Sequence, residues 1–373
     1  MTFIPNGDFS MNVNAVVYCE NEFGNMDGKI ANGLVRHSEK YNIVGIIDST
    51  KAGKDAGEYL DGINKGIPVF SDIDDAINKL DTVPAYFIYG LAPLEAFLKT
   101  ENREIIFRAM ENRMNIINGL HEFFTDDEEF LQKAEEYGVQ IYDIRKPPAK
   151  KDLHLFSGRI LKIDLPIIAV LGTDGATGKR TTSVILAEAL KQKGLNTAFL
   201  ATGQTGLIQG AKYGVALDAI VSEFTSGEIE NKLMEIYDNE HPDIIVVEGQ
   251  GALSHPAYIS SCAIIRGARP RAIIVQHPPK RKCLGDFPYM PMPTLESEIK
   301  LIEAFSKSPV IGLTINHENM TDEEIVQTIS DYEEKFGLPA TDVLKYGCEK
   351  LITKILTVFP ELSGKITDLH AKI

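Results

Sequence analysis

Cysteine is scarce in this chain: four occur among 373 residues, and Cys19, Cys262, Cys283 and Cys348 lie far apart. None belongs to a Cys-x-x-Cys pair, so the spacing disfavours disulfide frameworks and zinc clusters. We therefore expect reduced, mostly structural thiols of the kind found in cytosolic proteins.

Long apolar runs and an excess of positive charge are missing as well. No stretch reaches the roughly 18–20 apolar residues of a membrane span, and the N-terminus lacks the basic and apolar regions of a signal peptide. The 38 Lys and Arg are outnumbered by 53 Asp and Glu, for a formal net charge of −15, which argues against a nucleic-acid-binding surface. The sequence predicts a cytoplasmic protein with a small-molecule substrate and without membrane or nucleic-acid partners, and a homo-oligomer because two-fold assemblies are common.

The chain does contain a regular alternation of short Val- and Ile-rich runs with longer helical patterns. This alternation predicts α/β architecture with doubly wound parallel sheets, and the length favours two domains. In the first half we expect strands at 13–19, 43–48, 85–89, 114–117 and 139–144, and helices at 28–38, 73–80, 103–112 and 126–137. In the second half we expect strands at 167–171, 196–200, 243–248, 271–276, 310–314 and 340–344, and helices at 179–193, 228–237, 297–306, 322–336 and 349–357.

Segment 145–160 interrupts this alternation with paired prolines and several basic residues. Prolines favour extended backbone, and the basic residues are expected to stay in solvent. We interpret the segment as the link between an N-terminal domain, 1–150, and a C-terminal domain, 151–373. A loop inside one larger domain is the alternative.

Near the C-terminus, Thr321 is a candidate N-cap because three acids follow it.

The strongest motif is a buried strand, a glycine-rich turn and an amphipathic helix between residues 167 and 190. Glycines in the turn let backbone N–H groups approach an anion, and the helix N-terminus adds its dipole. Lys179 would supply a charge for the outer phosphates. We expect a P-loop NTPase-like domain whose ligand contacts come from Gly172, Thr173, Asp174, Gly175, Gly178, Lys179, Arg180, Thr181 and Thr182.

The motif departs from the usual phosphate loop in two ways. Five residues, not four, separate Gly172 from Gly178, and Arg180 stands where a metal-binding Ser or Thr usually follows the Lys. Magnesium would therefore need the displaced Thr181, together with a carboxylate such as Glu248. A glycine-rich turn with a surface lysine is the alternative.

Three further loops follow predicted strands of the same domain, and the carboxyl ends of parallel strands line the ligand crevice of an open α/β sheet. Glu248 closes an apolar strand and is a candidate general base, as is His255 in the loop behind it. For the loop at 203–206 the alternative is a flexible connection, and for His255 it is a plain core histidine. For the loop around Lys280 and Arg281 it is a solvated charge run. The remaining candidates are Gly203, Gln204, Thr205 and Gly206 for the cofactor and Gln250, Ser254, His277, Lys280 and Arg281 for the substrate.

The N-terminal domain has a loop after its first strand and Asp48 at the end of its second, the layout of dinucleotide-binding domains. Its glycines Gly24, Gly28 and Gly33 do not form G-x-G-x-x-G. We expect a Rossmann-like topology without a nicotinamide site.

The motifs GTDGATGKRTT, ATGQTG and VVEGQGALSHPAY, in this order, resemble a family of proteins catalogued as a domain of unknown function. Its members pair an N-terminal Rossmann-like domain with a C-terminal P-loop domain similar to dethiobiotin synthetase. They include the DgcN-type enzymes, which acetylate the amino group of D-glutamate with acetyl-CoA.

The resemblance implies an N-acyltransferase whose phosphate loop holds the phosphates of CoA and whose Glu248 or His255 acts as general base. Two alternatives remain. One is an ATP- and Mg²⁺-dependent carboxylate-activating ligase in the manner of dethiobiotin synthetase, and the other is a non-catalytic nucleotide-binding regulator.

Overall fold

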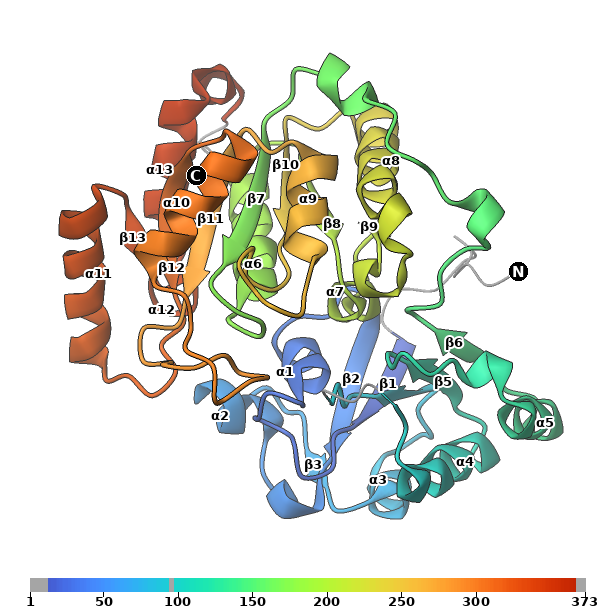
Figure 1. Ribbon diagram of the computed structural model, residues 1–373. Helices are drawn as coiled ribbons and strands as arrows, with labels where there is room; N and C mark the ends of the chain where they lie inside the picture. Colours follow the sequence, from blue (N-terminus) through green and yellow to red (C-terminus); the bar gives the residue numbers. More distant parts are fainter. Residues whose placement is uncertain (1–12, 94–96, 367–373) are drawn as a thin grey trace. The chain divides into compact units, whose positions relative to one another are not determined.

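The computed structural model describes residues 13–93 and 97–366, and it divides into two compact units. The first unit holds the described residues through Lys150 together with Gln204–Ala211, and the second holds Lys151–Gly203 and the described residues from Lys212 onward. The chain therefore leaves the second unit for eight residues and returns to it (Figure 1).

The N-terminal unit contains a parallel sheet of six strands in the order β3-β2-β1-β4-β5-β6. This is the strand order of dinucleotide-binding domains, so the Rossmann-like topology is confirmed. The strands are β1 (Val13–Tyr18), β2 (Tyr41–Ile47), β3 (Val69–Phe70), β4 (Tyr86–Tyr89), β5 (Asn115–Asn118) and β6 (Ile141–Asp143). The helices are α1 (Lys29–Arg36), α2 (Ala56–Asp61), α3 (Ile73–Lys79), α4 (Arg103–Glu111), α5 (Glu128–Tyr137) and, from later in the chain, α7 (Gln204–Gln209).

The C-terminal unit contains a parallel sheet of seven strands in the order β13-β12-β11-β7-β10-β8-β9. The strands are β7 (Ile167–Gly172), β8 (Thr197–Ala201), β9 (Tyr213–Gly214), β10 (Ile244–Glu248), β11 (Ala272–His277), β12 (Val310–Ile315) and β13 (Ala340–Thr341). The helices are α6 (Lys179–Gln192), α8 (Ser222–Glu240), α9 (Ser260–Ala268), α10 (Leu295–Ser306), α11 (Asp322–Phe336), α12 (Val343–Tyr346) and α13 (Glu349–Val358).

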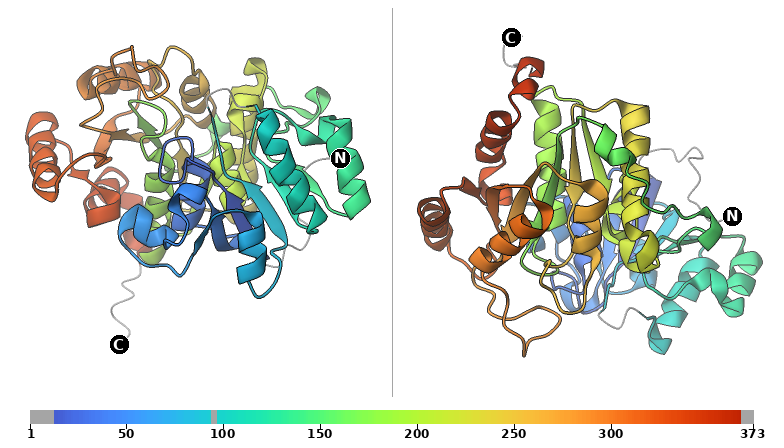
Figure 2. Two further views of the ribbon diagram at one scale, coloured as in Figure 1. Left: turned by 90° about the horizontal axis from the view of Figure 1, so that it is seen from below. Right: turned by 45° about the horizontal axis from the view of Figure 1, so that its top comes forward.

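Helices pack on both faces of this second sheet (Figures 1 and 2). Ala169 and Leu171 of β7 belong to a core with residues of α8, α9 and α10, whereas Ile168 and Val170 belong to a core with residues of α6 and α13. Successive side chains of a strand point to opposite faces. A continuous apolar run such as 167–171 is therefore the signature of a central strand covered on both sides.

The predicted elements are confirmed with shifts of up to three residues at their ends, with two exceptions. The helix predicted at 228–237 begins six residues earlier, as α8 at Ser222, and the strand predicted at 340–344 is shorter. Only Ala340–Thr341 is a strand, because the side chain of Asp342 caps α12 by accepting from the N–H groups of Leu344 and Lys345. The predicted cap at Thr321 is confirmed as a capping box with Glu324. Helices α2, α7, α9 and α12 and the two-residue strands β3 and β9 were not predicted.

The basic residues of segment 145–160 were expected to stay in solvent, and this expectation is wrong for the first of them. Arg145 is buried and donates through Nε to the carbonyl of Gly119 at 2.6 Å. Further along, Ser157 donates to the buried carboxylate of Glu230 on α8. The segment is thus anchored to the folded units at several points.

Two findings concern the chain as a whole. None of the helices among the described residues is both long and apolar enough to span a bilayer. All four cysteines are free thiols, in keeping with the spacing argument.

Candidate functional site

The phosphate loop connects the end of β7 to the start of α6. Gly172 has no room for a side chain, since a Cβ there would lie 2.8 Å from the carbonyl oxygen of Gln276. Gly178 adopts φ +100°, a left-handed conformation that favours glycine, and it caps α6 without a side-chain hydrogen bond. No side chain therefore caps the first turn of α6, where N–H groups and the helix dipole attract an anion.

Lys179 is buried and lies over this loop. Its ammonium group donates to the carbonyl of Asp174 and to Oγ1 of Thr177, the latter at 3.2 Å. A phosphate bound on the loop would compete with neutral oxygens for this charge. A charge-assisted bond to an anion is stronger than one to a neutral oxygen, so the arrangement fits a phosphate group.

Asp174 and Arg281 hold the loop in shape. The buried carboxylate of Asp174 accepts from Gly175 N at 2.7 Å, Gly285 N at 2.8 Å and Arg281 Nη1 at 2.9 Å. Arg281 also donates to the carbonyl of Gly175 and to Glu318. Burial opposes the charge of Arg281, but its bonds with Glu318 and Asp174 outweigh burial and raise its pKa.

Arg281 is therefore committed to protein groups, although the sequence suggested a role in binding substrate. Its neighbour Lys280 pairs with Glu324 at the surface. A role for either residue in binding substrate stays a prediction, and each would have to exchange a carboxylate of the protein for one of the substrate.

Glu248 ends β10 next to β7 and is buried. Its Oε2 accepts from Thr202 N at 2.9 Å, and Gln250 donates to Oγ1 of the same Thr202. Burial raises the pKa of Glu248 to about 7, against the opposing charges of Arg180 and Lys179. A carboxyl group with this pKa can accept and release a proton near neutral pH.

His255 lies in the loop after β10, with its side chain fully buried. Its Nε2 is 3.7 Å from Oδ1 of Asp174, beyond hydrogen-bond reach, and has no hydrogen-bond partner among the described residues. The ring stacks on Tyr258, which donates to Asp286 at 2.5 Å. Burial lowers the pKa of His255, against the nearby carboxylates Asp174 and Asp286.

The loop that carries His255 is supported from α10 by Glu298, which sequence reasoning missed. Its carboxylate accepts from Leu253 N at 2.6 Å and from the hydroxyl of Ser254 at 2.5 Å. Burial raises the pKa of Glu298. Ser254, predicted to bind substrate, is thus engaged in holding its own loop.

Two polar residues at strand ends tie α6 and the loop to the sheet. Oε1 of Gln276 accepts from Thr182 at 2.6 Å, and Asn316 donates to the carbonyl of Thr177 at 3.0 Å. Thr173, predicted to bind the cofactor, and His277, predicted to bind substrate, are hydrogen-bonded to each other at 2.8 Å. Burial, and then Arg281, lowers the pKa of His277 to about 4. Sequence reasoning missed Gln276 and Asn316, although a polar residue closing an apolar strand is a signal for both.

Of the two predicted magnesium ligands, Thr181 and Glu248, the second has a raised pKa that favours its protonated form in acid solution. A role for this pair in holding magnesium stays a prediction. In the described part of the chain, no three His, Cys, Asp or Glu side chains form a cluster that could hold an ion.

The predicted cofactor loop at 203–206 is divided between the two units. Gly203 stays in the C-terminal unit, where a Cβ would lie 2.7 Å from Nε2 of Gln250. Gln204, Thr205 and Gly206 begin α7, which belongs to the N-terminal unit. The structure thus places these three residues in a different unit from the phosphate loop, and their role as ligand contacts stays a prediction.

In the N-terminal unit, Asp48 stands where dinucleotide-binding domains hold a ribose. It is fully buried and accepts from Phe23 N at 3.1 Å and Thr50 N at 2.9 Å. Phe23 is itself part of the core. The acid is thus occupied with the loops around it, and the absence of a nicotinamide site stays a prediction.

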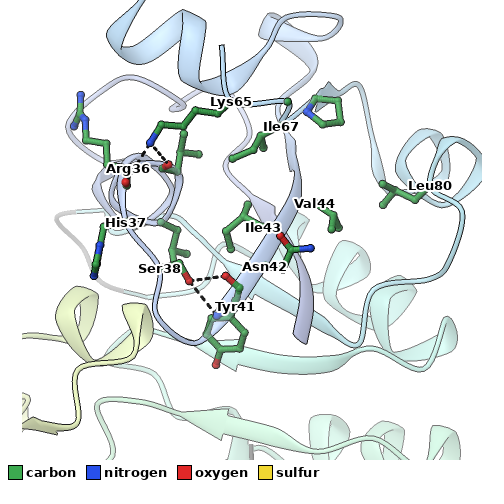
Figure 3. A pocket seen from close by; sticks show the side chains of 14 residues that line it. Arg36, His37, Ser38, Tyr41, Asn42, Ile43, Val44, Lys65, Ile67 and Leu80 are labelled. Carbon is green, nitrogen blue, oxygen red and sulfur yellow. Dashed lines mark hydrogen bonds between the residues drawn. The ribbon is translucent and has the colours of Figure 1, made fainter. Parts of the chain in front are cut away.

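Two cavities lie at the amino ends of strands, one in each unit. One, of about 490 Å³, is lined by Tyr41–Val44 at the start of β2, and Lys65 at its rim donates to the carbonyls of Val35 and Arg36 (Figure 3). The other, of about 530 Å³, is lined by residues just before β7, β10 and β11. Ligands of α/β sheets bind at carboxyl ends, so neither cavity is the candidate site.

A family profile described as the DUF1611 Rossmann-like domain of unknown function matches residues 49–147, and one described as the DUF1611 P-loop domain matches residues 154–352. A protein of Pseudoalteromonas named D-glutamate N-acetyltransferase is 32% identical over 276 residues, 72% of this chain and 80% of that protein. A protein of the same name from Tritonibacter scottomollicae is 29% identical over 277 residues, 73% of this chain and 81% of that protein.

A solved structure agrees with these matches. The crystal structure of a DUF1611 family protein from Anabaena variabilis has a TM-score of 0.84 and 29% sequence identity, covering 93% of this chain and 100% of that one. The resemblance seen in the motifs is therefore confirmed in sequence and in fold. The chain belongs to the DUF1611 family, in which a Rossmann-like domain precedes a P-loop domain.

Proposed function

We propose that the protein is an N-acetyltransferase that transfers the acetyl group of acetyl-CoA to the amino group of an acidic amino acid. D-Glutamate is the substrate that we favour. The names of the two curated relatives support this activity. The observation that carries the proposal here is the buried Glu248, with a pKa of about 7, between Thr202 and the cations that follow the phosphate loop.

The phosphate loop would hold the phosphates of CoA. The uncapped first turn of α6, Lys179 and Arg180 supply donors and positive charge. A pyrophosphate does not require a metal-binding hydroxyl after Lys179, so Arg180 is compatible with CoA.

Glu248 would take a proton from the substrate ammonium group, and the free amine would attack the thioester carbonyl carbon. The nitrogen of the tetrahedral intermediate carries one proton too many for an amide. As the intermediate collapses, the new C–N bond remains, the C–S bond breaks, and the leaving CoA thiolate takes up this proton. General-base assistance of this kind is worth roughly 10²–10⁴ in rate.

Purified protein, acetyl-CoA and D-glutamate should release free thiol and form N-acetylglutamate in equal amounts, measured with a thiol reagent and by mass spectrometry. L-Glutamate and D-aspartate test chirality and chain length. If no thiol is released with any D- or L-dicarboxylic amino acid, the proposal is wrong.

The phosphate loop also supports a second candidate, an ATP-dependent ligase that activates a carboxylate. Calorimetric titrations with CoA and with Mg-ATP discriminate between the two. Tight binding of Mg-ATP, with ADP formed only when a carboxylic acid is added, would favour the ligase. Binding of either ligand without turnover would favour a regulator.

A further inference from the structure

Among the described residues, only two buried side-chain polar atoms lack a hydrogen-bond partner: the hydroxyl of Tyr41 and Nε2 of His255. Tyr41 lies in the N-terminal unit, far along the sequence from any candidate residue. His255 faces the phosphate loop, because its Nε2 is 3.7 Å from Oδ1 of Asp174. A native protein leaves few buried polar atoms unpaired, so this one requires an explanation.

The backbone fixes which nitrogen of His255 carries the proton. The N–H of Ala257 donates to Nδ1 at 3.2 Å. A backbone N–H can only donate, so Nδ1 is the acceptor and the proton of the neutral ring is on Nε2. His255 therefore presents an N–H group toward the loop, which suits a hydrogen-bond donor and not a base at that nitrogen.

The surroundings keep the ring in place and neutral. It stacks on Tyr258 with ring centres 4.4 Å apart and lies beside Phe287. The charged groups that act on it are Asp174, Asp286 and Lys179, and burial is the largest influence on its pKa, which it lowers. The nearest carboxylate oxygen, Oδ1 of Asp174, accepts from Gly175 N and is 3.7 Å from Nε2, too far to be the partner of the ring.

We propose that His255 is a ligand-binding residue whose Nε2–H donates a hydrogen bond to a phosphate oxygen of the anion on the phosphate loop. This inference replaces the role of general base suggested by the sequence and leaves that role to Glu248. It rests on the proposed function only in taking CoA as the natural ligand.

The test compares His255→Phe with His255→Gln, using CoA and ADP as probes in calorimetric titrations. Phenylalanine keeps the stacking on Tyr258 but has no donor, whereas the Gln side chain can place an N–H near the position of Nε2. We expect His255→Phe to weaken binding of whichever probe the wild type binds by roughly 10- to 100-fold, and His255→Gln to recover most of the loss. His37→Phe, at a partly exposed histidine of the N-terminal unit, controls for the loss of a ring nitrogen.

The tautomer is tested independently by the ¹⁵N spectrum of histidine-labelled free protein, in which the His255 signals are identified by their absence in His255→Phe. Thermal unfolding establishes that each variant is folded. Wild-type affinity in a folded His255→Phe protein or a proton on Nδ1 would each overturn the proposal. None of these measurements needs acetyl transfer, so a failure of the proposed reaction would leave the result on His255 standing.

Discussion

At the scale of single residues, the site contains ionisable groups whose environment disfavours their charge. Glu248 is the clearest, because burial raises its pKa to about 7. A carboxyl group that prefers its proton in the folded state makes folding more favourable at low pH. The stability it contributes is lost as the pH rises from the unfolded pKa, near 4.5, to the folded one.

At pH 8, the free energy of unfolding of Glu248→Gln should therefore exceed that of the wild type by on the order of 3 kcal/mol. The difference should disappear near pH 4. The Gln carbonyl can still accept from Thr202 N. The same variant should lose about 10²–10⁴ in kcat, and the wild-type rate should rise with pH through about 7. Urea unfolding at both pH values and a pH–rate profile check these outcomes; equal stability at pH 8 would contradict the buried charge.

His277 acts in the opposite direction, because its pKa is lowered to about 4. Protonation favours the unfolded chain, so the stability contributed by neutral His277 is lost as the pH falls from about 6.5 toward 4. His277→Asn keeps a polar partner for Thr173 but cannot titrate. We expect the wild type to lose about 2 kcal/mol more than this variant between pH 7 and pH 5. If urea unfolding shows that the wild type and His277→Asn lose the same free energy of unfolding over this range, protonation of His277 does not destabilise the fold.

At the scale of elements, the phosphate loop depends on one guanidinium group. Arg281 joins Asp174, the Gly175 carbonyl and Glu318, and a lysine cannot reproduce this planar set of donors. Arg281→Lys should lower CoA affinity by about tenfold and increase hydrogen exchange in the loop, at a stability cost of roughly 1–3 kcal/mol.

Lys280→Ala is the matched control, because its pair with Glu324 is at the surface and surface pairs contribute only about 0–1 kcal/mol. Calorimetry and hydrogen exchange measure both variants. If Arg281→Lys binds CoA as tightly as Lys280→Ala does, the loop does not depend on this residue.

At the scale of the whole molecule, α7 is part of the N-terminal unit although its sequence follows β8. Ile208 is fully buried in the core of that unit, and Gln209 donates to the carbonyls of Gly33 and His37. Ile208→Ala should reduce stability by about 2–5 kcal/mol and reduce hydrogen-exchange protection in α1. Leu207→Ala, on the same helix but partly exposed, should have a smaller effect. Equal effects of the two variants would contradict the grouping of α7 with the N-terminal unit.

Most of the fold could be predicted because the two sheets are parallel and covered on both faces. Their strands read as continuous apolar runs, such as 167–171, and the helices between them show caps such as Thr321. The misses were short elements. A two-residue strand such as β3 carries no periodicity. In α9, SSCAIIRGA, the apolar residues 262–265 are consecutive and not spaced at a helical period.

The candidate site was predicted less evenly, for a physical reason. A phosphate loop is local, so its glycines and Lys179 can be read from spacing alone, and the family follows from the same motifs. Which charged side chains are available to a ligand depends on distant segments. Arg281 is bound to Asp174, 107 positions away, and to Glu318, which follows another strand. The sequence by itself determined the two α/β sheets, the phosphate loop and the family. Only the tertiary structure decided that Glu248 is buried beside cations, that Nε2 of His255 carries a proton without a partner, and that Gln204–Ala211 belongs to the other unit, because burial and pairing depend on which distant segments pack together.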